Sequence, residues 1–362
     1  MDPRLDEFRS DLTGYCYRML GCGFEAEDAV QETLVRAWRG FDRYDENRAP
    51  LRSWLYAIAT NVCLDMLRSA QRRARAMDLS PASHAGAPLG GPLPENAWIH
   101  PIPDGRVLPA GGDPGDVVAQ RETVRLAFIA ALQHLPPRQR AVLILRDVLC
   151  WTAAEVSGLL DTSVASVTSA LQRARATLGA ADVAPNGATP ARATPARTTL
   201  HGATPDGAAP AGLAPAGPFA ALDGAQRRLL DRYCDAFERY DVEALVALLH
   251  EDATMSMPPF AWWLRGRDEI RRALLGAGRP CEGARLMPAM ANGSPAFGQY
   301  RPAGPEGGYR PFALLVVELS GGLIRDTTTY LDAERLFPLF GLPAEIAGTG
   351  SDEFAVAAPY YG

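Results

Sequence analysis

Two stretches rich in proline and glycine interrupt this 362-residue chain and prevent it from folding around one continuous core. The first runs from Leu79 to Gly115; the second, Val183 to Pro218, is almost wholly Ala, Pro, Thr and Gly. Such compositions bury too little apolar surface to offset about 1–2 kcal/mol of backbone entropy per ordered residue, so both are predicted to be flexible linkers. The sequence therefore predicts three folded blocks. Block one is 1–78, block two 116–180 and block three 219–345, with linkers at 79–115 and 181–218 and a tail at 346–362.

The composition is that of a soluble globular protein, with 47% hydrophobic and 22% charged residues. All 36 basic residues are Arg, against 42 acidic ones, which gives a net charge of −6. A uniformly basic surface is excluded, so any nucleic-acid binding must come from local Arg clusters. The six cysteines show no zinc-ligand spacing, and neither a signal peptide nor a membrane-spanning run is apparent. We expect a cytoplasmic protein with no membrane association, no metal and no cofactor.

Block one is predicted to be helical, and its first strongly periodic helix spans Glu25 to Arg39. The apolar residues that recur at three- and four-residue steps are Ala26, Ala29, Val30, Leu34, Ala37 and Trp38. The opposite face carries Glu27, Asp28, Gln31 and Glu32. This acidic face is either an ordinary solvated surface or a docking site for a basic partner.

A second helix of block one is predicted from Leu51 to Arg73, after a charged loop at 40–50. Its apolar side comprises Leu55, Ile58, Ala59, Val62 and Met66. Its other side is mostly basic and amide, and capture of an unstacked DNA base requires aromatic and amide groups beside Arg on the phosphates. The candidates for this role are Phe41, Tyr44, Arg52, Trp54, Asn61, Arg68 and Arg72. For Trp54, packing in the core is an equal alternative.

Block two shows the pattern of a helix-turn-helix. Pro136-Pro137 begins one helix, and Thr152 with Glu155 forms a capping box for a short helix through Leu160. The last helix runs to about Leu178, with Val164, Val167, Leu171, Ala174 and Leu178 predicted to face inward. Its outer face offers groups that bind base edges and phosphates: Ser166, Thr168, Ser169, Gln172, Arg173 and Arg175. The alternative is an ordinary solvated face.

Block three begins helical and then changes to a two-residue period, which predicts an α+β domain with an antiparallel sheet. The predicted strands are 253–257, 285–291, 296–301, 312–319 and 323–331, with a helix at 266–275 and a hairpin turn at Ser320-Gly321-Gly322. Five residues are candidates to line an apolar ligand pocket, or simply to fill the core: Met255, Met257, Trp262, Trp263 and Tyr330.

Two runs of sequence carry a family resemblance. The run DAVQETLVRAWRGFDRYDENRAPLRSWLYAIATNVCLDMLR and the later run LPPRQRAVLILRDVLCWTAAEVSGLLDTSVASVTSALQRARATL closely resemble regions two and four of sigma-70 factors of the extracytoplasmic-function group. The resemblance implies that Asp28, Gln31 and Glu32 bind core RNA polymerase. It also implies that the loop and Asn61 recognise the −10 promoter element and that the last helix of block two reads the −35 element. Many relatives carry a basic residue at the positions where this chain has Thr168 and Ala170.

Two further segments resemble parts of a sigma-factor subgroup. Trp98 to Asp104 resembles a linker motif that precedes region four, and sigma-factor linkers generally run through the polymerase cleft. The run YCDAFERYDVEALVALLHEDATMSMPP resembles the SnoaL-like fold, a curved sheet that closes a cone-shaped cavity with helices. The resemblance implies a C-terminal regulatory domain, which acts through a small-molecule ligand or through an intramolecular partner.

Three functions follow as hypotheses. The first is a promoter-specificity subunit that binds core RNA polymerase and promoter DNA and is not an enzyme. The alternative is an isomerase-like enzyme fused to a DNA-binding region, with His250, Asp326, Tyr330 and Asp332 as candidate acid–base groups. A simple helix-turn-helix activator ranks last, because it leaves the helices of block one without a role.

Overall fold

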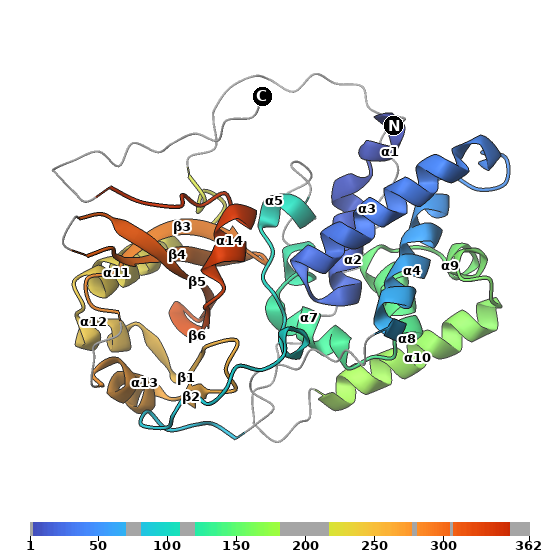
Figure 1. The fold of residues 1–362 in the computed structure, drawn as a ribbon. Helices are drawn as coiled ribbons and strands as arrows, with labels where there is room; N and C mark the ends of the chain where they lie inside the picture. The colour runs from blue at the N-terminus through green and yellow to red at the C-terminus, as the bar shows by residue number, and fades with distance from the viewer. Residues whose placement is uncertain are drawn as a thin grey trace. The chain divides into compact units, whose positions relative to one another are not determined.

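The computed structural model describes residues 3–69, 81–108, 120–181, 217–276, 281–304 and 307–347. They form two compact units, each described here by itself. The first unit contains block one, residues 95–108 and block two. The second contains residues 81–94 and block three. Figure 1 shows that the first unit is built of helices alone, whereas the second unit has a sheet flanked by helices.

Block one consists of four helices and a single 3-10 turn among its described residues: α1 (Pro3–Asp6), α2 (Arg9–Leu20), α3 (Gly23–Gly40), η1 (Phe41–Arg43) and α4 (Leu51–Ser69). The predicted stripe of α3 faces the core as expected at Val30 and Leu34, which are buried. Trp38 is a correction to that prediction, because its side chain is 58% exposed near the C-terminal end of α3. Trp38 follows Leu34 by four residues and keeps the apolar period of α3, but the elements that cover Leu34 do not extend over it.

Residues 95–108, within the segment predicted as a flexible linker, have regular structure and pack on block one. They contain η3 (Glu95–Ala97) and α5 (Asp104–Val107), and α5 packs on α2. Two glycines permit the close approach: a Cβ at Gly14 would lie 3.2 Å from the Val107 carbonyl oxygen, and one at Gly23 would lie 3.4 Å from Ile102.

Block two contains α7 (Leu126–Gln133), α8 (Pro137–Leu143), the π-helical turn η4 (Ile144–Val148), α9 (Ala153–Leu159) and α10 (Val164–Ala181). The predicted capping box is confirmed, since the Glu155 amide donates to the Thr152 hydroxyl and the Thr152 amide donates to the Glu155 carboxylate. The helix-turn-helix buries Val167, but the inward prediction for Val164 is wrong: it is 47% exposed at the first turn of α10. Blocks one and two share one hydrophobic core.

The second unit contains a six-stranded sheet with the order β2-β1-β6-β5-β4-β3. Its strands are β1 (Leu249–Ser256), β2 (Trp263–Arg265), β3 (Arg285–Ala291), β4 (Ser294–Pro302), β5 (Tyr309–Ser320) and β6 (Leu323–Tyr330). The sheet is mixed and not antiparallel throughout as predicted, because β1 pairs with β6 in parallel. Strand β2 was missing from the prediction since three residues are too short to show a period.

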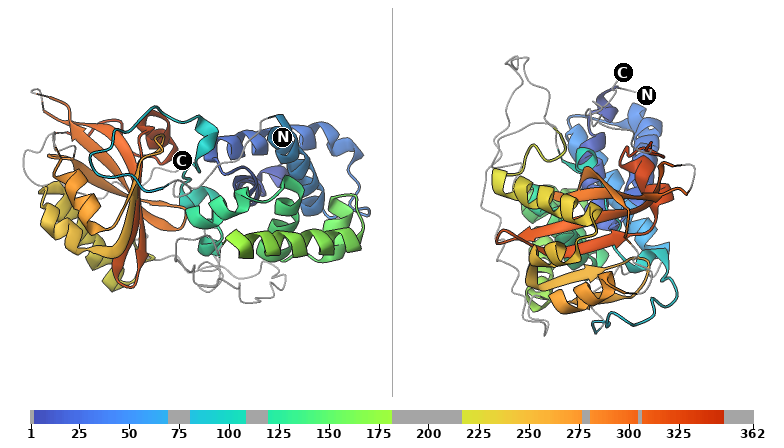
Figure 2. Two further views of the ribbon diagram at one scale, coloured as in Figure 1. Left: turned by 90° about the horizontal axis from the view of Figure 1, so that it is seen from below. Right: turned by 90° about the vertical axis from the view of Figure 1, so that its left-hand side faces the viewer.

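Helices cover both faces of this sheet (Figure 2). One face packs on α11 (Gly224–Glu238), α12 (Val242–Ala247) and α13 (Arg267–Leu274), with Tyr233 and Phe297 in the shared core. The other face carries α14 (Ala333–Leu339), whose Phe337 packs on Tyr300. The core between the sheet and α11 is thus occupied by aromatic side chains, with the Tyr233 and Phe297 ring centroids 6.1 Å apart.

Candidate polymerase and nucleic-acid interfaces

The acidic face of α3 lies at the surface of the first unit. Asp28, Gln31 and Glu32 are all exposed, whereas Glu27 is half-buried and forms an ion pair with Arg106 at 2.9 Å. The exposed Trp38 lies two to three turns further along the same helix. Trp is enriched at the centres of protein interfaces and charged residues at their rims, so an exposed Trp further along an acidic helix face is compatible with a docking surface.

The loop that joins α3 to α4 is organised by three aromatic side chains. Trp54 stacks on Tyr44 with ring centroids 4.9 Å apart and planes at 28°, and Phe41 lies 5.9 Å from Tyr44. The Tyr44 hydroxyl donates to the Ala49 carbonyl at 3.0 Å, which closes the loop. All three rings are half-buried, and Trp54 both joins this surface cluster and packs against the core of the unit. The cluster offers flat faces on which an unstacked base can lie.

The outer face of α4 follows this aromatic cluster. Asn61 and Arg68 are exposed on one side of this helix, whereas Arg52, nine residues before Asn61, is exposed on nearly the opposite side; Arg72 lies outside the described residues. The structure thus brings six of the seven candidate residues for −10 DNA onto one loop and one helix. Arg52 differs from the others, because its guanidinium lies 5.5 Å from the ring centroids of both Tyr56 and Trp151.

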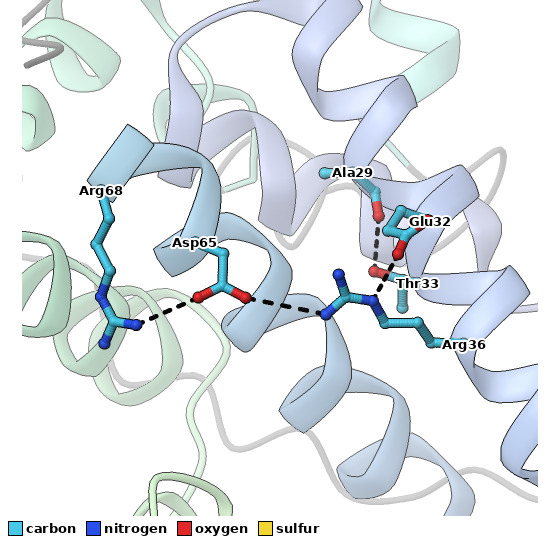
Figure 3. A network of polar contacts seen from close by, with 6 residues as sticks. All are labelled: Ala29, Glu32, Thr33, Arg36, Asp65 and Arg68. Carbon is cyan, nitrogen blue, oxygen red and sulfur yellow. Dashed lines mark hydrogen bonds and ion pairs between the residues drawn. The ribbon is translucent and has the colours of Figure 1, made fainter. Parts of the chain in front are cut away.

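A chain of charges connects the α3 face with the α4 face, as Figure 3 shows. Glu32 pairs with Arg36 at 2.6 Å, Arg36 lies 4.0 Å from Asp65, and Asp65 pairs with Arg68 at 3.2 Å. These side chains are 44–69% exposed, so each pair contributes little to stability. Sequence reasoning missed the role of Arg36, although its spacing four residues after Glu32 was a readable signal.

The recognition-helix candidates on α10 are all exposed, but their side chains differ in what they contact. Thr168 donates to the Val164 carbonyl at 3.0 Å, and the Ser166 hydroxyl lies 2.9 Å from that of Ser163. Arg175 donates two hydrogen bonds to Asp147, at 2.9 and 2.7 Å, and these bonds raise its pKa above the usual value. Ser169, Gln172 and Arg173 complete the outer face.

The five residues predicted for a ligand pocket do not lie on one side of the sheet. Met255 pairs with Leu264 and contacts the core beneath α11–α13, as do Met257 and Trp262. Trp263 pairs with Ser256, one residue further along β1, so its side chain belongs to the opposite face.

Tyr330 lies on that same opposite face of the sheet. Ser256 pairs with Thr328, and Tyr330 follows Thr328 by two residues on β6. Both Trp263 and Tyr330 are buried. Sheet register therefore separates these two residues from the methionines and Trp262.

Three of the four acid–base candidates make local contacts. The Asp326 carboxylate accepts from the hydroxyls of Thr254 and Thr328, which is the pattern of a structural group satisfied within the sheet. Asp332 begins α14 and pairs with Arg335 at 3.6 Å. His250 accepts from the Asp252 amide at 3.1 Å.

Comparison with protein families assigns each block. Residues 5–73 match the model "Sigma-70 region 2", residues 125–178 match "Sigma-70, region 4", and residues 230–325 match "SnoaL-like domain". Two helical sigma regions followed by an α+β SnoaL-like domain define a sigma factor with a C-terminal extension. The chain belongs to the ECF RNA polymerase sigma factors, since it is 40% identical over 345 residues to SigG of Mycobacterium tuberculosis, covering 93% of this chain and 82% of that protein.

More distant similarity agrees with this assignment. SigJ of Mycobacterium tuberculosis is 29% identical over 277 residues, or 75% of this chain and 71% of that protein. The crystal structure of SigJ has the same fold, with a TM-score of 0.55 at 21% identity, and the match covers 95% of this chain and all of that one. ECF sigma factors are not enzymes. Among the described residues, no helix is both long and apolar enough to cross a membrane.

Proposed function

We propose that this sigma factor divides promoter recognition between two surfaces. The α3 face with Asp28, Gln31 and Glu32 docks on core RNA polymerase. The aromatic loop and Asn61 open and read the −10 element, and α10 reads the −35 element. The observation that supports this most directly is the exposure of an aromatic–amide–arginine surface on α4, separate from a helix-turn-helix whose recognition helix is exposed along its outer side.

Run-off transcription with core polymerase on a promoter library tests the proposal. Asn61→Ala should abolish strand opening, measured by permanganate reactivity of unpaired thymines, while polymerase binding persists. Asp28→Arg should instead weaken polymerase binding. If the purified chain does not associate with core polymerase, the proposal is wrong.

We further propose that the SnoaL-like domain modulates activity by holding the linker between the two sigma regions. Three contacts support this: the Ser83 amide donates to the Trp263 carbonyl at 2.8 Å, the Leu93 amide to the Pro259 carbonyl at 2.8 Å, and the Ala85 amide to the Glu269 carboxylate at 2.9 Å. Strand β2 is the edge of the sheet, and unpaired backbone groups at an edge bind extended chain. The partner of this domain is then intramolecular, the segment 83–93.

Two substitutions on α13 distinguish the Ala85–Glu269 hydrogen bond from the adjacent Glu269–Arg272 ion pair. Glu269→Ala removes the acceptor of the Ala85 amide and also the ion pair with Arg272, whereas Arg272→Ala removes the ion pair and a hydrogen bond to the Asp268 carbonyl but keeps that acceptor. Glu269→Ala should change promoter output at least twofold, in the same direction as deletion of residues 219–362, and Arg272→Ala should not. Unchanged transcription by the truncated chain would rule out this modulation.

A further inference from the structure

The short helix α1 places an arginine on the aromatic loop. Arg4 lies with its guanidinium 5.2 Å from the ring centroid of Phe41 and donates to the Glu46 carboxylate at 3.3 Å. The next residue, Leu5, is fully buried in the core of the first unit, and α1 packs on α3. The buried leucine therefore fixes where Arg4 lies, although a helix of four residues has little stability of its own.

Glu46, the partner of Arg4, is held in a tight turn of the loop. The Asn47 backbone amide donates to the Asp45 carboxylate at 2.9 Å, and the Asn47 side chain donates to the same oxygen at 3.1 Å. Phe41 lies in η1, at the start of the loop. Arg4 thus joins the start of the loop to its turn, and we call Arg4, Phe41 and Glu46 the Arg4 bridge.

The Arg4 bridge places two opposite charges near a stacked ring. Phe41 lies 5.9 Å from Tyr44, the ring that stacks on Trp54. Burial raises the pKa of Tyr44; the Glu46 carboxylate raises it further, and the Arg4 guanidinium opposes that rise. The charges of the bridge therefore act on the ring surface on which the proposed function places an unstacked base.

A surface for single-stranded DNA needs a cation beside such rings. Proteins that bind unstacked strands combine aromatic faces with positive groups along the backbone, and Arg also stacks on aromatic rings. Arg4 meets both conditions, because it lies over Phe41 and its charged side chain is 51% exposed. Glu46 has the opposite sign, and like charges repel, so its carboxylate disfavours a phosphate at this position.

The ion pair of the Arg4 bridge is easily exchanged. The Glu46 side chain is 69% exposed, so water screens its attraction to Arg4 and the pair adds little to stability. A phosphate accepts charge-assisted hydrogen bonds from a guanidinium, as a carboxylate does. A DNA phosphate can therefore replace the Glu46 carboxylate as the partner of Arg4, while the contact with Phe41 remains.

Resting on the function proposed above, we propose that Arg4 binds a backbone phosphate of the strand that the aromatic loop captures. Its partner changes from the Glu46 carboxylate to that phosphate, and the Phe41 ring holds the guanidinium in place. Helix α1 then belongs to the −10 site together with the loop and Asn61. In the chain without DNA, Glu46 competes for Arg4 and so lowers the affinity for the strand.

Binding of a forked promoter by the complete holoenzyme, measured across a salt series, tests this proposal. The probe is the promoter of highest run-off output, made single-stranded across its −10 element. Arg4→Ala should lower affinity about threefold or more at low salt and reduce the salt slope by about 0.7, the contribution of one phosphate in a single strand. Arg4→Lys should keep most of that slope, because it retains the charge but not the planar contact with Phe41. The matched control is Arg9→Ala, which removes the same charge from an arginine that pairs with Asp6 at 2.8 Å, and it should change neither quantity.

Glu46→Gln should act in the opposite direction. It removes the carboxylate that competes for Arg4, so affinity should rise about two- to threefold at low salt. Glu7→Gln makes the same change in net charge at an exposed position between α1 and α2, and it should raise affinity little.

Equal effects of Arg4→Ala and Arg9→Ala would refute the phosphate contact. A loss of affinity with an unchanged salt slope would also refute it, because Arg4 would then only shape the loop. In both cases, loss of strand opening by Asn61→Ala would leave the proposed function standing. If Asn61→Ala affects neither binding nor opening, the −10 surface itself is wrong, and the Arg4 proposal falls with it.

Discussion

Arg175 on the recognition helix donates from both Nε and Nη2 to the carboxylate of Asp147, at 2.9 and 2.7 Å. The pair joins α10 to the π-helical turn η4, and the Asp147 side chain is only 22% exposed. The same fork of donors is what a guanidinium uses to bind guanine. Arg175 therefore cannot read a base and hold Asp147 at the same time.

Arg173→Ala should cost more −35 recognition than Arg175→Ala. A bidentate contact with a base contributes about 1–3 kcal/mol of discrimination, so loss of Arg173 should lower −35-dependent transcription by about tenfold or more. Arg175→Ala should cost about threefold or less, because that side chain is already engaged. Transcription from promoters with an intact or a scrambled −35 element measures the difference; equal losses would contradict the prediction.

The sequence predicted the helix-turn-helix well because its signals are local. The proline pair and the Thr152–Glu155 box each act within one helical turn, and both appear where expected. Exposure was harder to predict near helix ends. Trp38 and Val164 fit the apolar period of their helices, but the neighbouring elements that would have to cover them lie elsewhere.

Thr152→Ala should destabilise α9 by about 1 kcal/mol at neutral pH, the usual cost of losing an N-cap. The hydroxyl and amide of Thr152 hold the pKa of Glu155 below its usual value. A carboxylate with a lowered folded-state pKa contributes stability above its unfolded pKa and loses it as pH falls through the folded value. The difference between variant and wild type should therefore be larger at pH 7 than at about pH 3.

Amide hydrogen exchange of α9 in the full-length chain measures this change. Ser157→Ala is the control, because its hydroxyl donates to the Ala154 carbonyl inside the same helix and does not cap it. An equal effect of the two substitutions, or no dependence on pH, would show that the box is not stabilising.

Gly298→Ala should destabilise the packing of the C-terminal segment on the sheet. A Cβ at Gly298 would lie 2.8 Å from Leu342 Cδ1 and 3.4 Å from Phe337 Cζ, so β4 has room for no side chain there. We expect a cost of about 1 kcal/mol, moderated because Leu342 is only half-buried and can move.

Thermal unfolding followed by tyrosine and tryptophan fluorescence tests this prediction. Leu342→Ala makes room for a Cβ at position 298. The double variant Gly298→Ala/Leu342→Ala should therefore be more stable than Leu342→Ala alone. Gly158→Ala is a useful contrast: its site on α9 is open, so it should stabilise by up to about 1 kcal/mol. A neutral Gly298→Ala would show that Leu342 does not pack as described.

The long-range pairings could not be predicted from the sequence for a physical reason. Local alternation locates a strand but does not choose its neighbour, so the parallel β1–β6 pair had no local signal. Two of the three contacts of residues 83–93 join backbone groups, which every residue type carries. The same register places Trp263 on the other face of the sheet from Met255, which is why the five predicted pocket residues do not define one pocket.

Asp65→Asn should strengthen binding of the free chain to duplex DNA. Asp65 lies 3.2 Å from Arg68 on the proposed −10 surface and 4.0 Å from Arg36, so its charge competes with phosphate for both guanidinium groups. Exposed pairs of this kind contribute about 0.2–1 kcal/mol, so affinity should rise about two- to threefold at low salt. The gain should shrink as salt increases, because screening weakens exposed charges.

Fluorescence anisotropy with a labelled duplex across a salt series measures this effect. Asp235→Asn is the matched control: it makes the same change in net charge on α11 of the other unit, where Asp235 pairs with Arg239 at 2.5 Å. If both substitutions raise affinity equally, bulk charge explains the gain. If only Asp65→Asn does so, the charge chain from Glu32 to Arg68 restrains the DNA surface.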